Sequence, residues 1–88
     1  MYSYEIKPEL QRILKKLFKK DKKIYEAVIN KIEEIIQNPF HYKPLKYDSA
    51  GERRVHIMKS FVLKFEIDEN SKTVTFLTFS HHDEAYKR

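Results

Sequence analysis

Two histidines stand directly after the last strand-like run of this 88-residue chain. The run Val74-Thr-Phe-Leu-Thr-Phe-Ser80 is followed at once by His81 and His82, and Tyr86 lies four residues beyond His82. Imidazole has an unperturbed pKa of roughly 6.5, so it can donate or accept a proton near neutral pH. A third histidine, His56, lies on another strand-like run. If the protein performs chemistry, these residues predict an acid–base site near its C-terminal end.

Histidines combined with lysines or arginines supply what metal-free cleavage of RNA requires. In that reaction the 2′-hydroxyl attacks the adjacent phosphate, so a base must take its proton, an acid must protonate the leaving 5′-oxygen, and cations must hold the extra negative charge. His56 and His82 are candidates for the proton transfers. Cations could hold the phosphate, and an aromatic ring could stack on an unpaired base. The other candidate residues are Lys43, Lys46, Arg53, Arg54, Phe61, His81 and Tyr86.

Each of these residues also has a purely structural interpretation. A histidine on a half-exposed strand, such as His56, is more often a surface residue than a catalyst, and Arg53 and Arg54 could protect an edge strand from aggregation. Adjacent His81 and His82 could bind a transition metal, but no carboxylate or third histidine lies at a recognised ligand spacing, so no metal is expected. The residues alone therefore lead to a basic domain with a candidate histidine site.

Composition indicates one domain covering residues 1–88. The chain is 41% hydrophobic and 14% aromatic and contains a single glycine, which is typical of a folded globule that buries about two-thirds of its unfolded surface. Lys and Arg outnumber Asp and Glu by 18 to 13, giving a net charge of +5. A basic domain attracts RNA, DNA or an acidic protein, although lysine-rich helices can also serve solubility alone.

Several classes of function are disfavoured by what the sequence lacks. Without cysteine there are no disulfides, thiolate nucleophiles or zinc–thiolate sites. No apolar run approaches the roughly 20 residues of a membrane span, and the N-terminal residues lack a signal-peptide core. We expect a cytoplasmic protein that needs no membrane and no cofactor.

Periodicity predicts the element order β-α-α-β-β-β. Residues 2–6 alternate as a short strand does, and Pro8 suits the first turn of a helix whose apolar residues fall at i, i+3, i+4 and i+7. Asp21 can cap a second helix, which Asn38-Pro39 stops. The pattern indicates two helices that pack against a sheet.

The second half of the chain predicts three strands after a loop. Residues 40–51 have no clean period and indicate an ordered loop or an irregular edge strand, whereas residues 53–59, 61–67 and 73–80 are strand-like. Two helices can cover one face of so small a sheet, so the face holding Arg54 and His56 is expected to be open. The predicted fold class is α+β, a small antiparallel-rich sheet with both N-terminal helices on one face.

The chain resembles the RelE/ParE superfamily of toxin–antitoxin toxins over essentially its whole length. The resemblance is carried by the element order, Pro44-Leu-Lys46, Arg54-Val-His-Ile57, Phe61-Val-Leu-Lys-Phe-Glu-Ile67 and His81-His-Asp-Glu-Ala-Tyr86. Many RelE-type members enter the ribosomal A site and cut mRNA there. The resemblance implies a RelE-like fold and an mRNA interferase, a ribosome-dependent endoribonuclease that inhibits translation and is held inactive by an acidic antitoxin encoded nearby.

Within the superfamily the chain is most similar to the YafQ-type branch. That branch has a strand histidine in the place of His56 and, in the place of His82, a histidine four residues before a terminal aromatic, here Tyr86. The resemblance implies that His82 is the general acid and that His56 is the base or a phosphate contact. Phe61 matches an aromatic position that stacks on a base or packs.

The sequence departs from the family pattern at three positions. Val62 stands where RelE itself carries an arginine, Ser60 where the YafQ-type branch has an acidic residue, and Lys43 where it has another histidine. A lysine at position 43 can stabilise charge but is a poor proton shuttle at neutral pH. Two alternatives therefore stay open: a ParE-like inhibitor that binds DNA gyrase without cutting nucleic acid, and a degenerate toxin that only binds.

Overall fold

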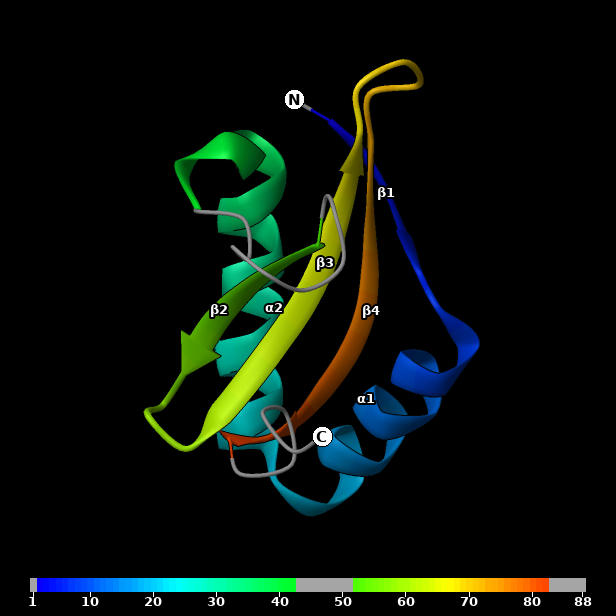
Figure 1. The fold of residues 1–88 in the computed structure, drawn as a ribbon. Coiled ribbons are helices and arrows are strands. Elements are labelled where there is room, and N and C mark those ends of the chain that lie inside the picture. Colours follow the sequence, from blue (N-terminus) through cyan, green and yellow to red (C-terminus); the bar gives the residue numbers. More distant parts are fainter. Residues whose placement is uncertain (1, 43–51, 83–88) are drawn as a thin grey trace.

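Four strands and two α-helices make up the part of the chain that the structure, a computed structural model, describes: residues 2–42 and 52–82. The predicted α+β class and the order β-α-α-β-β-β are confirmed, with a short 3₁₀ helix added before the second strand (Figure 1). The elements are β1 (Ser3–Ile6), α1 (Pro8–Lys20), α2 (Lys22–Gln37), the 3₁₀ helix η1 (Pro39–His41), β2 (Glu52–Ile57), β3 (Phe61–Asp68) and β4 (Thr73–His81).

The helix boundaries follow from local chemistry. Pro8 opens α1, where its missing N–H costs no helical hydrogen bond. Asp21 is the single residue between the helices, and its carboxylate accepts a hydrogen bond from the backbone N–H of Ile24 at 3.2 Å. α2 ends before Asn38 because the residue preceding a proline disfavours the helical conformation.

The sheet is mixed, with strand order β1-β4-β3-β2. β1 lies parallel to β4, and the β3–β4 and β2–β3 pairs are antiparallel, so the antiparallel-rich expectation is confirmed. β1 and β2 are the two edges.

One face of the sheet packs against both helices and forms the core. Leu10 and Leu14 on α1 and the isoleucines of α2 meet the apolar side chains of the strands, and the two largest fully buried side chains are phenylalanines of β3 and β4. Burying these side chains is the main favourable contribution to folding. The buried core cluster is Leu10, Leu14, Val28, Ile32, Ile35, Ile36, Ile57, Leu63, Phe65, Val74, Phe76 and Phe79.

The strand predicted over residues 53–59 extends two residues beyond the end of the observed strand β2. β2 stops at Ile57, because Met58 and Lys59 adopt positive φ angles of 52° and 64° and form the turn to β3. Neither residue has the side chain that usually marks a left-handed turn, so the alternation appeared to continue through them.

None of the helices within residues 2–42 and 52–82 has the length and apolar character needed to cross a membrane.

Candidate functional site

His56 lies on the sheet face opposite the helices. Its neighbour Ile57 belongs to the core cluster, and successive side chains of a strand point to opposite faces, so His56 points away from the core. In the sheet it pairs with Val62 on β3, which in turn pairs with Ser80 on β4. The His56 side chain is exposed, as the sequence predicted.

A β-bulge in β4 determines the side on which His82 emerges. The partners of two adjacent β3 residues are Thr78 and Phe76, so Leu77 between them is an extra residue on β4. Without this residue, simple alternation from the buried Phe76 would turn His82, six positions later, toward the helices. The bulge reverses the alternation and brings His82 to the face that carries His56.

The two imidazoles are in direct contact. The ring centroids of His56 and His82 are 5.2 Å apart and the ring planes are inclined by 29°, a stacked arrangement. His82 is half-buried. The fold thus brings together two residues that are 26 positions apart in the sequence, and that they act together stays a prediction.

The turn between β2 and β3 fixes the backbone of His82. The His82 N–H donates a hydrogen bond to the carbonyl oxygen of Ser60 at 2.6 Å, and the Ser60 N–H donates to the carbonyl oxygen of Met58 at the same distance. This second bond closes a γ-turn around Lys59, whose φ of 64° is unfavourable for a residue with a Cβ atom. The backbone of Ser60 therefore links the turn to His82, because its N–H closes the turn and its carbonyl oxygen binds the His82 N–H.

Phe61 and His81 lie on the other face of the sheet. They are paired across β3 and β4, and the His81 ring meets the Phe61 ring edge-on at 5.8 Å between centroids. Phe61 also stacks on Phe79 at 5.1 Å, so its ring packs against the core. Two roles were expected for Phe61, packing and stacking on a base, and the structure shows packing. The RNA contacts predicted for Phe61 and His81 stay predictions.

Arg53 and Arg54 point to opposite faces. Arg54 lies on the histidine face, where its guanidinium approaches the Glu52 carboxylate at 3.8 Å and only 10% of the side chain is exposed. Arg53 turns toward the helices: its Nη1 donates a hydrogen bond to the Tyr42 carbonyl oxygen, and its guanidinium lies 5.1 Å from the centre of the Phe40 ring. The RNA-binding role predicted for Arg53 would require this guanidinium to leave its contacts.

Lys64 is a cation of the histidine face that was not among the predicted site residues. It pairs with Arg54 on one side and with Thr78 on the other, one row of the sheet away from His56. The strict alternation of residues 61–67 was the signal that could have identified it. Lys43, Lys46 and Tyr86, the remaining predicted site residues, lie outside the residues that the structure describes.

The histidine face is only partly open. Val62, between His56 and Ser80, is fully buried although it points away from the helical core. Farther along the same face, Glu66 is exposed and Lys64 is half-buried. The expectation of an open face therefore holds for part of this surface. Val62 contributes a buried apolar side chain to it but no charge.

A second polar cluster joins α2 to the segment before β2. The Tyr42 hydroxyl donates a hydrogen bond to Glu34 at 2.9 Å, and Lys31 approaches the same carboxylate at 3.4 Å. The Tyr42 hydrogen bond, more than Lys31, lowers the pKa of Glu34. Burial, together with the Glu34 carboxylate, raises the pKa of Tyr42 to about 12.

No group of three or more His, Asp or Glu side chains within residues 2–42 and 52–82 is arranged to hold a metal ion.

Comparison with known proteins identifies the family. A sequence model of the ParE toxin of the type II toxin–antitoxin system parDE matches residues 4–86. The chain belongs to this family. The RelE4 protein of Methanocaldococcus jannaschii is 56% identical to it over 88 residues, which are 100% of this chain and 94% of that protein. The superfamily resemblance found in the sequence is confirmed.

Solved structures of other toxins share the fold of this ParE-family chain. A chain of the toxin–antitoxin complex RelBE2 from Mycobacterium tuberculosis superposes with a TM-score of 0.75 at 25% identity, covering 92% of this chain and 98% of that one. A chain of the Escherichia coli DinJ–YafQ complex gives a TM-score of 0.76 at 16% identity, covering 99% and 100%. The second likeness shows the fold alone.

Proposed function

We propose that this toxin of a type II toxin–antitoxin system is an mRNA interferase, a ribosome-dependent endoribonuclease that cuts mRNA in the A site. The observation that carries the proposal is the stacked pair of His56 and His82 on the partly open face of the sheet. An imidazole can act as a general acid or as a general base, so two of them on one face can supply both proton transfers of the reaction.

The proposed reaction needs no co-reactant besides the RNA, which the ribosome presents. His56 takes the proton of a ribose 2′-hydroxyl, whose oxygen bonds to the adjacent phosphorus as the bond from phosphorus to the 5′-oxygen breaks. His82 gives its proton to that leaving oxygen. The products are a 2′,3′-cyclic phosphate and a free 5′-hydroxyl. Lys64 and Arg54, on the next row of the same face, are the described cations best situated to offset the charge of the transition state.

An acidic antitoxin is the partner that this proposal requires in the resting cell. The RelBE2 relative was solved as a toxin–antitoxin complex. A net charge of +5 suits a negatively charged partner that covers the site until it is removed. Pull-down with the product of the neighbouring reading frame is expected to recover a complex, and failure to do so would contradict this part of the proposal.

Primer extension on an mRNA under translation in a purified system tests the activity. We expect cuts that require ribosomes, and we expect His82→Ala to slow cleavage by about 10²–10⁴-fold because a general acid is lost. His41→Ala is the matched control, since it removes an exposed imidazole from η1, away from the pair. Cleavage by His82→Ala at the wild-type rate, in protein with an unchanged circular dichroism spectrum, would show that the site is wrong.

A second candidate function is supported by the family match itself, because the matching family carries the name ParE and not RelE. In that case the protein inhibits DNA gyrase by binding. A supercoiling assay with purified gyrase distinguishes the nuclease from the gyrase inhibitor. Inhibition of supercoiling by both wild type and His82→Ala, without any cut in translated mRNA, would favour gyrase inhibition as the function.

A further inference from the structure

The positive charge of the chain is concentrated in one segment. Residues 8–23, comprising α1, Asp21 and the start of α2, contain seven basic and two acidic side chains, and the rest of the chain contains eleven of each. The net charge of +5 therefore lies entirely on this segment, which we call the lysine hairpin. Its cations, all exposed, are Arg12, Lys15, Lys16, Lys19, Lys20, Lys22 and Lys23.

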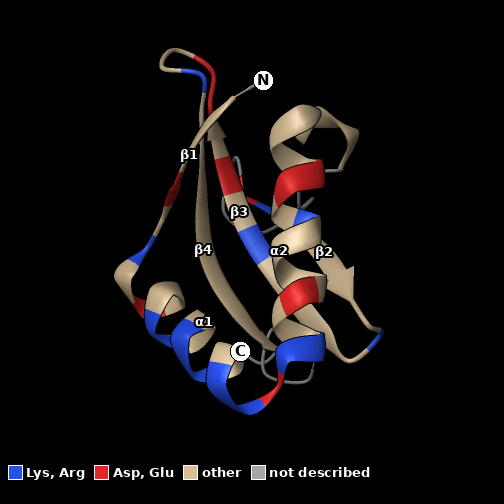
Figure 2. Cartoon of the chain, turned by 180° about the vertical axis from the view of Figure 1, so that it is seen from behind, with Lys and Arg blue, Asp and Glu red and all other residues tan. Residues whose placement is uncertain are grey.

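The lysine hairpin presents its cations in rows. Lys15 and Lys19 are one helical turn apart, as are Lys16 and Lys20, and Figure 2 shows the basic residues following one another along α1. Like charges at this spacing repel. Within residues 2–42 and 52–82 no carboxylate forms an ion pair with any cation of the hairpin, so no direct ion pair there relieves the repulsion. Cations kept together in this way favour an anionic partner over solubility alone.

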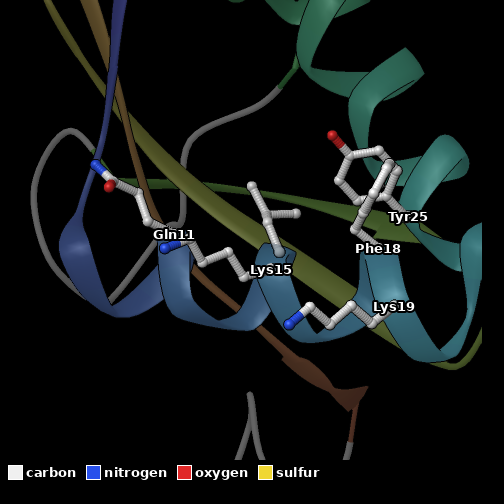
Figure 3. A pocket seen from close by; sticks show the side chains of 6 residues that line it. Gln11, Lys15, Phe18, Lys19 and Tyr25 are labelled. Carbon is white, nitrogen blue, oxygen red and sulfur yellow. The ribbon is translucent and has the colours of Figure 1, made fainter.

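A shallow recess lies beside the row of Lys15 and Lys19. It has a volume of about 530 Å³ and is lined by Lys15 and Lys19, together with the ring of Phe18, which is 50% exposed (Figure 3). The Lys22 ammonium lies 5.0 Å from the centre of the Phe18 ring, and the Tyr25 ring meets it edge-on at 5.1 Å. Lys22 thus already contacts the Phe18 ring, which makes the ring less suitable as an anchor for an apolar partner.

We propose that the lysine hairpin binds the phosphate backbone of folded ribosomal RNA. Six of its seven cations are lysines, which act as point charges and contact phosphates without the fixed geometry of arginine. Such contacts position a protein on a nucleic acid irrespective of sequence. An acidic peptide helix would instead need an apolar groove for its own apolar stripe, whereas the recess here is edged by Lys15 and Lys19, and its most exposed ring, Phe18, already contacts the Lys22 ammonium.

The hairpin is separate from the histidine site and complements it. This inference rests on the proposed function, because it assigns to the hairpin the docking of the toxin on the ribosome. The turn between α1 and α2 and the end of β4, where the histidines lie, are found at the same end of the molecule, the lower end in Figure 1. The histidines occupy the sheet face opposite the helices, so RNA held by the hairpin is not the strand that is cut.

Ribosome binding at several salt concentrations tests the proposal. The hairpin variant is Lys16→Gln, Lys19→Gln, Lys20→Gln, and the matched control Lys7→Gln, Lys31→Gln, Lys72→Gln removes the same charge elsewhere. Both are made in full-length protein carrying His82→Ala, and sedimentation with purified ribosomes is measured from 50 to 200 mM KCl. The logarithm of the binding constant falls as the logarithm of the salt concentration rises, and each lost phosphate contact makes this slope less negative by about 0.7–0.9. We therefore expect the slope to become less negative by about 2 in the hairpin variant and to change little in the control.

The possible outcomes separate the two proposals. An unchanged slope and ribosome affinity in the hairpin variant would overturn the hairpin proposal, because it excludes docking there. An equal loss of ribosome affinity in both triple variants would also overturn it, because the loss would then reflect net charge only. Normal ribosome binding with loss of the complex with the neighbouring gene product would also overturn it in favour of an acidic protein. If wild-type protein makes no cuts but its ribosome binding depends on the hairpin, the docking surface stands and the nuclease proposal fails.

Discussion

At the scale of single residues, contacts that hold the scaffold lie next to those of the candidate site. Arg53 and Arg54 are adjacent in the sequence, yet one binds the Tyr42 carbonyl and the other lies on the histidine face near Glu52. Tyr42 is a shared member of the scaffold contacts, because its hydroxyl also binds Glu34 on α2. The segment before β2 is thereby tied to a helix and to a strand.

The Tyr42–Glu34 hydrogen bond should make stability depend on pH at both extremes. The pKa of Tyr42 is raised to about 12 in the fold, so the bond contributes fully below pH 10 and is lost as the pH rises through about 12. The pKa of Glu34 is lowered, so the contribution is also lost in acid. We expect the gap in Tm between wild type and Tyr42→Phe to be widest near pH 7–9 and to narrow on either side. A gap that stays constant from pH 3 to 11 would contradict this.

At the scale of elements, the β2–β3 turn stores strain next to the candidate site. Met58 and Lys59 both have positive φ, and a left-handed residue with a Cβ atom costs about 1–2 kcal/mol. The turn in return supplies the Ser60 carbonyl that holds His82. Strain of this kind is found at functional sites, where the surrounding structure maintains it.

Replacing Lys59 by glycine should therefore leave the protein at least as stable. Relief of the positive φ offsets the extra freedom of glycine in the unfolded chain, so we expect a change between no effect and a gain of about 1 kcal/mol in the free energy of unfolding by urea. Lys64→Gly, in the middle of β3, is the matched control and should lose about 0.5–1 kcal/mol or more. An equal loss at both positions would mean that the turn is not strained.

The same elements show how far the sequence could predict the molecule. The faces of β2 and β3 follow from alternation, and the helices from stripes and caps, because these signals are local. The side taken by His82 depends on the extra residue Leu77, and the sequence indicates that bulge only by the three-residue spacing of Phe76 and Phe79. That His56 and His82 belong to one site was predicted from their residue type and from the resemblance, but their ring contact depends on the pairing of three strands and could not be predicted.

At the scale of the whole molecule, charge and chemistry are divided between two surfaces. The sheet face contributes two histidines among charges of both signs, whereas residues 8–23 hold the whole net charge of +5. Such a concentration of one sign speeds association with a polyanion but repels itself in the free protein. The cost of the lysine hairpin should therefore be measurable without any partner.

Salt should stabilise the free protein, and the hairpin should account for most of the effect. Exposed charges are screened over about 10 Å at 0.1 M and about 3 Å at 1 M ionic strength, so raising KCl from 0.01 to 0.5 M weakens the repulsion among the hairpin lysines. We expect the Tm of wild type to rise over this range and that of Lys16→Glu, Lys20→Glu to start higher and change less. The control pair Lys7→Glu, Lys72→Glu makes the same change of net charge outside the hairpin, because Lys7 follows β1 and Lys72 directly precedes β4. If it behaves like the hairpin pair, total charge and not its concentration on the hairpin governs the repulsion.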